Sequence, residues 1–153
     1  MTPSVVLDNS AICRYRFREP QWENVEPLVR AIRDRRVIAY APQHLLLEFL
    51  HVAKKKANVA GLKDGGRAVK RHYDWLATLP IQYVQVDYSA NVRELRLLID
   101  RGAGSYDALY VHLARQLDAP LCTCDKGIVA LHASGPRFKV FELDRDVSSL
   151  LET

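Results

Sequence analysis

The sequence predicts an α/β domain, a three-layer sandwich in which a mostly parallel central sheet is flanked by helices. Two observations predict it. Short apolar runs typical of buried parallel strands recur along the chain, and helical segments separate each run from the next. This alternation requires crossover connections, which place parallel strands side by side with helices on both faces. Because the 153 residues contain no linker or internal repeat, we expect one domain over residues 1–153.

Short apolar segments bounded by turn residues mark the expected strands. The first is β-branched and stops at Asp8, as a buried strand would, and the third alternates between apolar and polar side chains. The expected strands cover residues 4–7, 37–40, 81–86, 120–123 and 139–143.

Helical periodicity and capping residues fill the intervals between these strands. Pro27 suits the first turn of one helix, and Pro42 opens another that carries a broad apolar stripe. Ser89 and Ser105 are candidate N-caps, and Gly102 ends a helix. A helix or turn is expected over residues 10–17, helices over 27–36, 42–53, 67–79, 89–99 and 106–117, and a helical turn over 147–151.

The formal net charge of +4 is a weak indication of a polyanionic partner. The distribution of charge is more informative, because basic side chains gather between positions 54 and 71 against a single acid, Asp64. A solvated helix face and an RNA-binding arm explain such a run equally well, so both interpretations stay open. The candidate RNA-binding residues are Lys54, Lys55, Lys56, Lys63, Arg67, Lys70 and Arg71.

The three cysteines, Cys13, Cys122 and Cys124, are an odd number and favour a reduced, cytoplasmic setting. A Cys-x-Cys zinc half-site is the alternative, but no second Cys or His pair at ligand spacing accompanies it. No run approaches the roughly 18–20 apolar residues that span a bilayer, and the N-terminus lacks a basic region before its apolar stretch. We therefore expect neither a membrane segment nor a signal peptide.

Four carboxylates are candidates for chemistry. Asp8 and Asp125 each directly follow an expected strand, where open parallel sheets collect ligands, although N-capping of the next helix would also explain them. Asp107 lies two residues after Ser105 in the first turn of a helix, where the helix dipole also accounts for an acid. Glu48 stands among apolar residues, where burial without a partner would cost several kcal/mol unless the helix turns the side chain to solvent.

If the four acids converge, their mutual repulsion calls for a cation. Oxygen-only ligands suit Mg²⁺ or Mn²⁺, which can lower the pKa of a bound water and clamp the oxygens of a phosphodiester. No Ser-His-Asp or Cys-His arrangement competes, and the glycines at positions 61–66 lack the spacing of a phosphate-binding loop. The pattern indicates metal-dependent hydrolysis of a phosphodiester.

The segments around these acids resemble the PIN-domain nucleases, and among them the VapC-type toxins of bacterial type II toxin–antitoxin pairs. The opening strand with Asp8 and the nearby Ser10 is similar to the first motif of the family, and Glu48 falls where the second acid lies on a helix. Residues 105–114 are similar to the helix of the third acid, and residues 120–126 resemble the Thr-x-Asp at a strand end. Order and approximate spacing agree across nearly the whole chain.

The resemblance implies a PIN-like fold and an endoribonuclease that uses Mg²⁺ or Mn²⁺. The residues implied to be catalytic are Asp8, Glu48, Asp107 and Asp125. The three aspartates would hold the metal, with Asp8 and Asp107 as the likeliest direct ligands. Asp125 and Glu48 would act directly or through a metal-bound water, and Glu48 would orient the nucleophile. Ser10 and Thr123 would support a carboxylate or a water by hydrogen bonds. In-line attack by metal-activated water would leave a 5′-phosphate and a 3′-hydroxyl.

The resemblance also implies partners. A VapC-like protein would form a homodimer and be held inactive by a small antitoxin, which often places a basic side chain in the acidic pocket. The alternatives are a PIN nuclease in RNA processing and a PIN fold that binds RNA or protein without cutting, against which the four intact acids argue. A phosphatase-like domain fits less well, because it would need a second Asp two positions after Asp8, where Ser10 stands. A receiver-like domain would need an acidic pair before its first helix.

Overall fold

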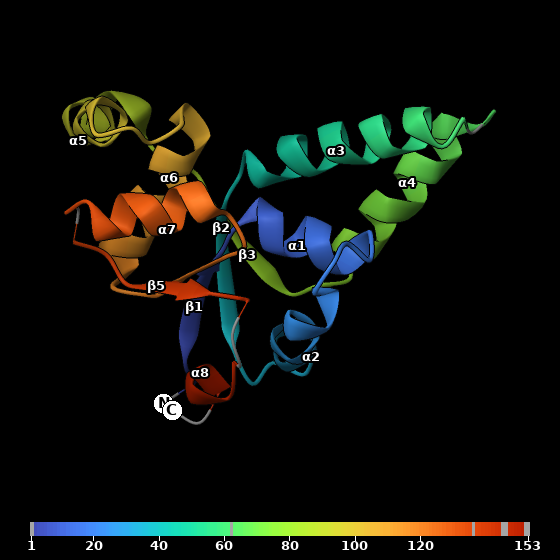
Figure 1. The fold of residues 1–153 in the computed structure, drawn as a ribbon, viewed down its shortest axis with the longest axis horizontal. Coiled ribbons are helices and arrows are strands. Elements are labelled where there is room, and N and C mark those ends of the chain that lie inside the picture. Colours follow the sequence, from blue (N-terminus) through green and yellow to red (C-terminus); the bar gives the residue numbers. More distant parts are fainter. Residues whose placement is uncertain (1, 62, 136, 145–146, 152–153) are drawn as a thin grey trace.

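The fold is an α/β sandwich built on a parallel sheet, which confirms the predicted fold class (Figure 1). A computed structural model describes residues 2–61, 63–135, 137–144 and 147–151. Within these residues the strands form one sheet in the order β3-β2-β1-β4-β5, and every neighbouring pair is parallel. The strands are β1 Ser4–Leu7, β2 Ile38–Pro42, β3 Ile81–Val84, β4 Leu121–Thr123 and β5 Val140–Glu142.

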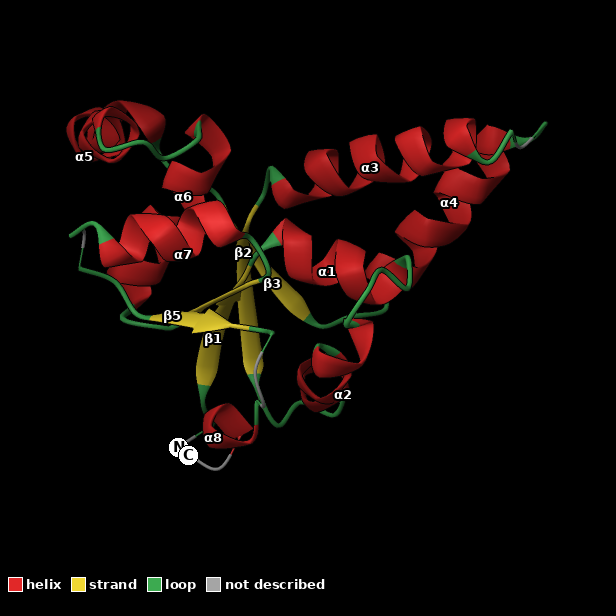
Figure 2. Cartoon of the chain, viewed as in Figure 1, coloured by secondary structure: helices red, strands yellow, loops and turns green. Residues whose placement is uncertain are grey.

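Two layers of helices enclose this sheet. The helices are α1 Asn9–Arg16, α2 Glu26–Arg33, α3 Leu45–Val59, α4 Gly65–Leu76, α5 Tyr88–Asp100, α6 Ser105–Leu117, α7 Lys126–Ala133 and α8 Ser148–Leu151, with a short 3-10 helix over Trp22–Asn24. Helices α1 to α4 lie on one side of the sheet, and α5 to α7 lie on the other (Figure 2). Across the described ranges, no helix combines the length and the apolar character that a membrane span requires.

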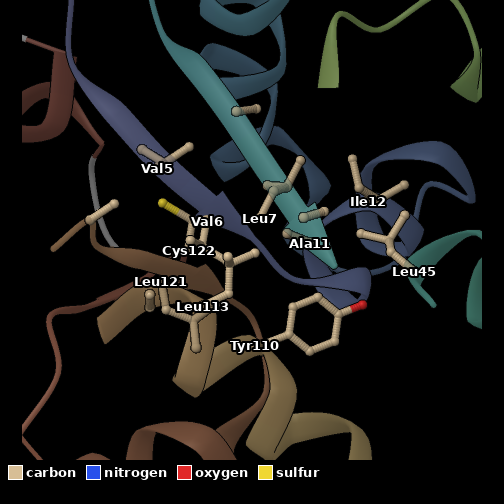
Figure 3. Packing of buried hydrophobic residues seen from close by; sticks show 14 of the residues in the cluster. Val5, Val6, Leu7, Ala11, Ile12, Leu45, Tyr110, Leu113, Leu121 and Cys122 are labelled. Atoms are coloured by element: carbon tan, nitrogen blue, oxygen red, sulfur yellow. The ribbon is translucent and has the colours of Figure 1, made fainter. Parts of the chain in front are cut away.

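The centre of the core lies where β1 and β4 meet α6. Val5, Val6 and Leu7 are completely buried on β1, as expected of a parallel strand covered on both faces. Tyr110 and Leu113 of α6 are equally buried and lie among these side chains (Figure 3). This packing fixes the carboxyl ends of β1 and β4 relative to the first turns of α6.

One predicted helix start is wrong because a proline was assigned to the wrong element. Pro42 ends β2, where its Cα pairs with Val84 of β3, and α3 begins only at Leu45. The last hydrogen bond on this side comes from the residue after the proline, because the N–H of Gln43 donates to the Val84 carbonyl at 3.1 Å. Helix α3 then continues through the lysines to Val59, well beyond the predicted end.

Two predicted caps are also wrong. Asp87 rather than Ser89 caps α5, because its carboxylate accepts from the N–H of Ala90 at 3.0 Å and the Ser89 hydroxyl donates to the same oxygen at 2.7 Å. Gly104 holds the N-cap position of α6, and Ser105 is the first residue of that helix. In both places two residue types that favour N-caps stand close together, so the sequence alone does not choose between them.

Helix α7 is absent from the elements predicted above. Gly127 stands in its first turn, and glycine is a poor helix former. The helix is nevertheless held by its apolar face, on which Ile128 and Leu131 are buried.

The strand order changes direction between β1 and β4. Strands β2 and β3 lie on one side of β1, whereas β4 and β5 lie on the other. In open α/β sheets, ligands bind beyond the carboxyl ends of the strands at such a reversal, because the loops there diverge to opposite faces. The ends of β1 and β4 are therefore the place to look for functional side chains.

Candidate active site

Asp8 stands at the carboxyl end of β1. Although it occupies the N-cap position of α1, its side chain accepts from two hydroxyl groups and from no N–H group of this fully described helix. Its Oδ2 atom accepts from Ser10 Oγ at 2.5 Å and from Thr123 Oγ1 at 2.7 Å. The residue is only 4% exposed. The capping explanation therefore fails for Asp8.

Ser10 and Thr123 join three elements around this carboxylate. The two hydroxyl oxygens lie 3.3 Å apart, and Ser10 Oγ accepts from the N–H of Cys124 at 2.9 Å. Thr123 Oγ1 accepts from the N–H of Asp125 at 2.9 Å. These bonds tie the start of α1 to the end of β4. The structure thus brings both predicted polar supports onto one oxygen of Asp8.

Asp125 occupies the N-cap position of α7. Its Oδ1 atom accepts from the N–H of Gly127 at 2.6 Å. A Cβ atom at position 127 would approach the same oxygen to 3.0 Å, so the glycine gives the carboxylate its room. The capping explanation therefore holds for Asp125, and it accounts for one of the two carboxylate oxygens.

Asp107 lies in the first turn of α6, against the backbone of Gly104. A Cβ atom at position 104 would come within 2.7 Å of Asp107 Oδ2, so a larger residue there would require this carboxylate to shift. Burial raises the pKa of Asp107, and the charges of Asp125 and Glu48 raise it further, against a lowering hydrogen bond from the Gly104 backbone. A helix dipole alone would lower that pKa, so the dipole does not explain the residue.

The four predicted acids share one electrostatic environment. Burial is the main cause that raises the pKa of Asp8 from 3.8 to about 6, and the two hydroxyl hydrogen bonds partly counteract it. The charges of Asp107 and Glu48 raise the pKa of Asp8 further, and the charge of Asp125 does the same for Asp107. Like charges have this effect only at close range, so the structure brings the acids together at the strand ends.

Glu48 lies in the first turn of α3, with its side chain 23% exposed. Its Oε2 atom accepts from the Tyr110 hydroxyl at 2.6 Å, and His44 Nε2 lies 3.3 Å from the same oxygen. Burial strongly raises the pKa of Tyr110, so the phenol stays protonated and donates. Partners on α6 and at the start of α3 therefore offset the cost of bringing this carboxylate into apolar surroundings.

Tyr110 and His44 are site residues that the sequence analysis missed. Both follow helical spacing, since Tyr110 comes three residues after Asp107 and His44 comes four residues before Glu48. Residues three or four apart lie on the same face of a helix, so this spacing is compatible with a shared site, but it does not single these two residues out. His44 Nε2 is buried and makes no hydrogen bond within the described residues, since its contact with Glu48 has the distance of an ion pair without hydrogen-bond geometry.

A second charged cluster borders Asp125. Lys126 contacts both Glu142 and Asp144, and Arg14 contacts Asp144. Hydrogen bonds, first of all from Lys126, lower the pKa of Asp144, and the same contact raises the pKa of Lys126. The sequence analysis did not find this cluster, because its members come from α1, α7, β5 and the chain after β5. This cluster contains two positive and two negative side chains, whereas the four predicted acids are all carboxylates.

The acids fit a hard divalent cation in their chemistry. Carboxylate oxygens are the ligands that Mg²⁺ prefers, and Mg²⁺ keeps several waters while taking one or two carboxylates directly. A cation would also relieve the charge that burial penalises at Asp8. Among the described residues, no three acid, His or Cys side chains already form a metal-binding group. The fit is therefore to a hydrated ion rather than to one ligated entirely by the protein.

The three cysteines lie in the interior. Cys13, Cys122 and Cys124 are all buried and unpaired, with no metal-binding group around them in the described ranges. Burial raises the pKa of Cys13 and of Cys124 to about 12, so these thiols stay neutral and unreactive. They serve the packing of α1 and β4.

The basic segment forms the hairpin of α3 and α4, which projects from the body of the protein (Figure 1). Three of its residues pair with acids: Lys56 with Glu19 at 2.7 Å, Arg67 with Asp64 at 2.9 Å and Lys70 with Asp74 at 2.6 Å. Within the described chain no ion pair is formed by Lys54, Lys55, Lys63 or Arg71. Lys54 lies roughly 9 Å beyond Glu48 along α3, so the hairpin begins near the acids and extends away from them.

Comparisons with known proteins agree with this architecture. The crystal structure of PAE2754 from Pyrobaculum aerophilum is similar in fold, with a TM-score of 0.60 and 20% sequence identity over 99% of this chain and 96% of that chain. No curated protein sequence matches the chain. The PIN domain matches residues 5–133, a span that holds all four acids. The chain therefore belongs to the PIN domain family, whose members are generally metal-dependent nucleases.

Proposed function

We propose that the protein is a metal-dependent endoribonuclease, with residues 1–153 as one catalytic domain. The observation that carries this proposal is Asp8, a buried carboxylate at the reversal of strand order whose pKa is raised by burial and by the charges of Asp107 and Glu48. Ionisable groups held in such unfavourable surroundings gather at functional sites. Membership of the PIN family supports nuclease chemistry, and RNA is the typical substrate of PIN nucleases.

Asp8, Asp107 and Asp125 are proposed to hold Mg²⁺ or Mn²⁺, Asp8 and Asp107 directly and Asp125 directly or through a bound water, and Glu48 is proposed to orient the attacking water. When bound, the ion supplies Lewis-acid stabilisation of the phosphodiester and of the attacking water. The hydroxyls of Ser10 and Thr123 donate to Oδ2 of Asp8, so Oδ1 is the oxygen that would face the metal ion.

The protein itself orients the water and its proton. The Tyr110 hydroxyl occupies Oε2 of Glu48, so Oε1 is the atom that accepts a proton from water. As the water oxygen bonds to phosphorus, the bond from phosphorus to the 3′-oxygen breaks. That oxygen takes up a proton from solvent, and Glu48 releases to solvent the proton it accepted. The products are a 5′-phosphate and a 3′-hydroxyl.

The biological role we propose is that of a VapC-type toxin in the cytoplasm. Its small cognate antitoxin would inhibit it by placing a basic side chain among the four acids, whose charge is not balanced within the site. The toxin would act as a homodimer. The exposed basic residues of the α3–α4 hairpin would contact RNA phosphates without regard to sequence.

The metal requirement tests the proposed function directly. Purified protein is expected to cleave RNA with Mg²⁺ or Mn²⁺ and to lose that activity in EDTA. The bound ion acts as the Lewis acid, a role that the carboxylates cannot take. Gel analysis of RNA before and after metal is restored measures this. Undiminished cleavage in EDTA would contradict the mechanism, and an inactive protein with metal would contradict the function.

Replacement of Tyr110 by phenylalanine tests the role of Glu48. The ring still fills its place in the core, but the hydroxyl that holds Oε2 of Glu48 is lost. Because partners of catalytic carboxylates are typically worth 10- to 100-fold, we expect kcat to fall by about tenfold while KM changes little. Steady-state kinetics on one RNA substrate would separate the two constants. Unchanged kcat in a folded Tyr110→Phe protein would exclude this positioning role.

A further inference from the structure

A pocket of about 750 Å³ opens beside the four acids. Glu48, one of those acids, and Asn9, the residue after Asp8, are among its lining residues. Tyr88 of α5 and Tyr106 of α6 line it as well, and each is 58% exposed. The volume lies within the range of pockets that bind small organic groups. The pocket is therefore continuous with the proposed active site through Glu48.

The ring of Tyr106 packs against a second aromatic ring. It stacks on the imidazole of His44, with ring centroids 5.2 Å apart and an angle of 19° between the planes. His44 in turn meets the edge of the Tyr110 ring at 4.9 Å and 69°. An aromatic ring that already rests on a second ring loses little conformational freedom when a ligand stacks on it. Tyr106 combines this support with a large exposed area, so it can serve as a stacking platform.

We propose that this pocket receives one unpaired nucleobase of the RNA, stacked on Tyr106 while the adjoining phosphodiester lies at the acids. The proposal rests on the proposed function. Every base offers a flat π face to an aromatic ring, but a base inside a duplex has both faces covered by its neighbours. The site is therefore specific for single-stranded RNA or loops. A base is also uncharged, so it can lie beside Glu48 without the repulsion that a phosphate would meet there.

Polar groups in the pocket suit the edge of a base. Asn9 Oδ1 accepts from the Cys13 thiol at 3.5 Å, and its amide nitrogen makes no hydrogen bond in the described part of the chain. His51 is exposed in the same pocket. Leu47 and Val52 line the pocket as well, beside Glu48 and two histidines. This mixture of apolar side chains and hydrogen-bonding groups suits a base, which has a flat apolar face and a polar edge.

Binding to an inactive protein tests the base pocket separately from catalysis. Asp107→Asn protein with Mg²⁺ is titrated against a short fluorescein-labelled single-stranded RNA, and Kd is measured by anisotropy. Adding Tyr106→Leu keeps an apolar side chain but removes the π face, and we expect Kd to rise about tenfold to a hundredfold. Adding Tyr106→Phe instead should recover most of that loss. Adding Ile99→Ala instead truncates a side chain of α5 that is 43% exposed outside the pocket, and it should leave Kd unchanged.

A duplex control and the oligomeric state complete the test of the base pocket. The same RNA annealed to its complement should show no effect of Tyr106→Leu, because a paired base cannot enter the pocket. An unchanged Kd in Tyr106→Leu, or an equal loss in Ile99→Ala, would overturn the base pocket while RNA cleavage by the wild type kept the proposed function intact. Absence of both cleavage and binding would overturn both proposals. A changed molecular mass of Tyr106→Leu in light scattering would place the tyrosine between two copies of the chain and overturn the base pocket.

Discussion

Replacement of Asp107 by asparagine is expected to lower kcat/KM for RNA cleavage by about a thousandfold or more. Asparagine has the size of aspartate and fits the space beside Gly104, but it removes one negative charge from the proposed metal ligands. Lewis-acid stabilisation by a bound ion is worth several kcal/mol, and each factor of ten in rate corresponds to about 1.4 kcal/mol. Loss of three decades therefore requires only about 4 kcal/mol.

A matched control separates this effect from general damage. Asp100→Asn makes the same chemical change on α5, where the exposed carboxylate lies 3.6 Å from Arg96 on the helix surface. We expect that variant to cleave RNA at the wild-type rate. Circular dichroism and thermal unfolding of both variants establish that the fold is retained. A folded Asp107→Asn protein that still cleaves at more than a tenth of the wild-type rate would exclude Asp107 from the site.

The acids at strand ends are the part of this site that can be predicted from sequence. Asp8 and Asp125 each follow an apolar run too short for a helix, and the carboxyl ends of parallel strands meet at one edge of the sheet. Asp107 and Glu48 lie on helices instead. Their position and apolar surroundings made them candidates, but their convergence depends on how each crossover packs on the sheet, which periodicity alone does not specify. Only the family resemblance implied that they meet Asp8 and Asp125.

The features that sequence reasoning missed depend on contacts between distant elements. The hydroxyl of Tyr110 reaches Glu48 across 62 positions of the chain, and Arg14 reaches Asp144 across 130. A tyrosine within an apolar helix face and an arginine at a helix end have ordinary local explanations, so neither stands out before the fold is known. The N-cap of α5 could not be predicted for a related reason. Asp87 and Ser89 both favour N-caps and stand within one turn, so only the structure shows which of them caps the helix.

Replacement of Asp8 by asparagine is expected to stabilise the metal-free protein at neutral pH while it abolishes cleavage. The folded-state pKa of Asp8, about 6, lies above its ordinary value of 3.8. The folded protein therefore binds a proton more tightly than the unfolded chain does, and its free energy of unfolding falls as pH rises through the window from 3.8 to about 6. Two pKa units correspond to a loss of about 3 kcal/mol at most.

The asparagine variant lacks this pH-dependent loss. Its amide oxygen can still accept from the hydroxyls of Ser10 and Thr123, so the hydrogen bonds that orient Asp8 are kept. At about pH 4 the two proteins should have similar stability, and at about pH 7.5 the variant should be more stable by roughly 1–3 kcal/mol. Urea denaturation in EDTA at several pH values measures both, with Asp100→Asn as the control that should follow the wild type.

The response to metal distinguishes a functional carboxylate from a merely strained one. If Asp8 is kept charged in order to hold a cation, Mg²⁺ should restore stability to the wild type near pH 7.5, because an ion that binds only the folded state raises its free energy of unfolding. Asp8→Asn should gain much less from Mg²⁺, since its site has lost that charge.

An Asp8→Asn variant that gains as much stability from Mg²⁺ as the wild type would show that Asp8 is not a ligand. Equal pH profiles without metal would show that the charge of Asp8 is not costly in the fold. In the expected pattern, the carboxylate destabilises the metal-free protein and stabilises the metal-bound one. This pattern would explain why the sequence keeps an acid among side chains that are otherwise apolar.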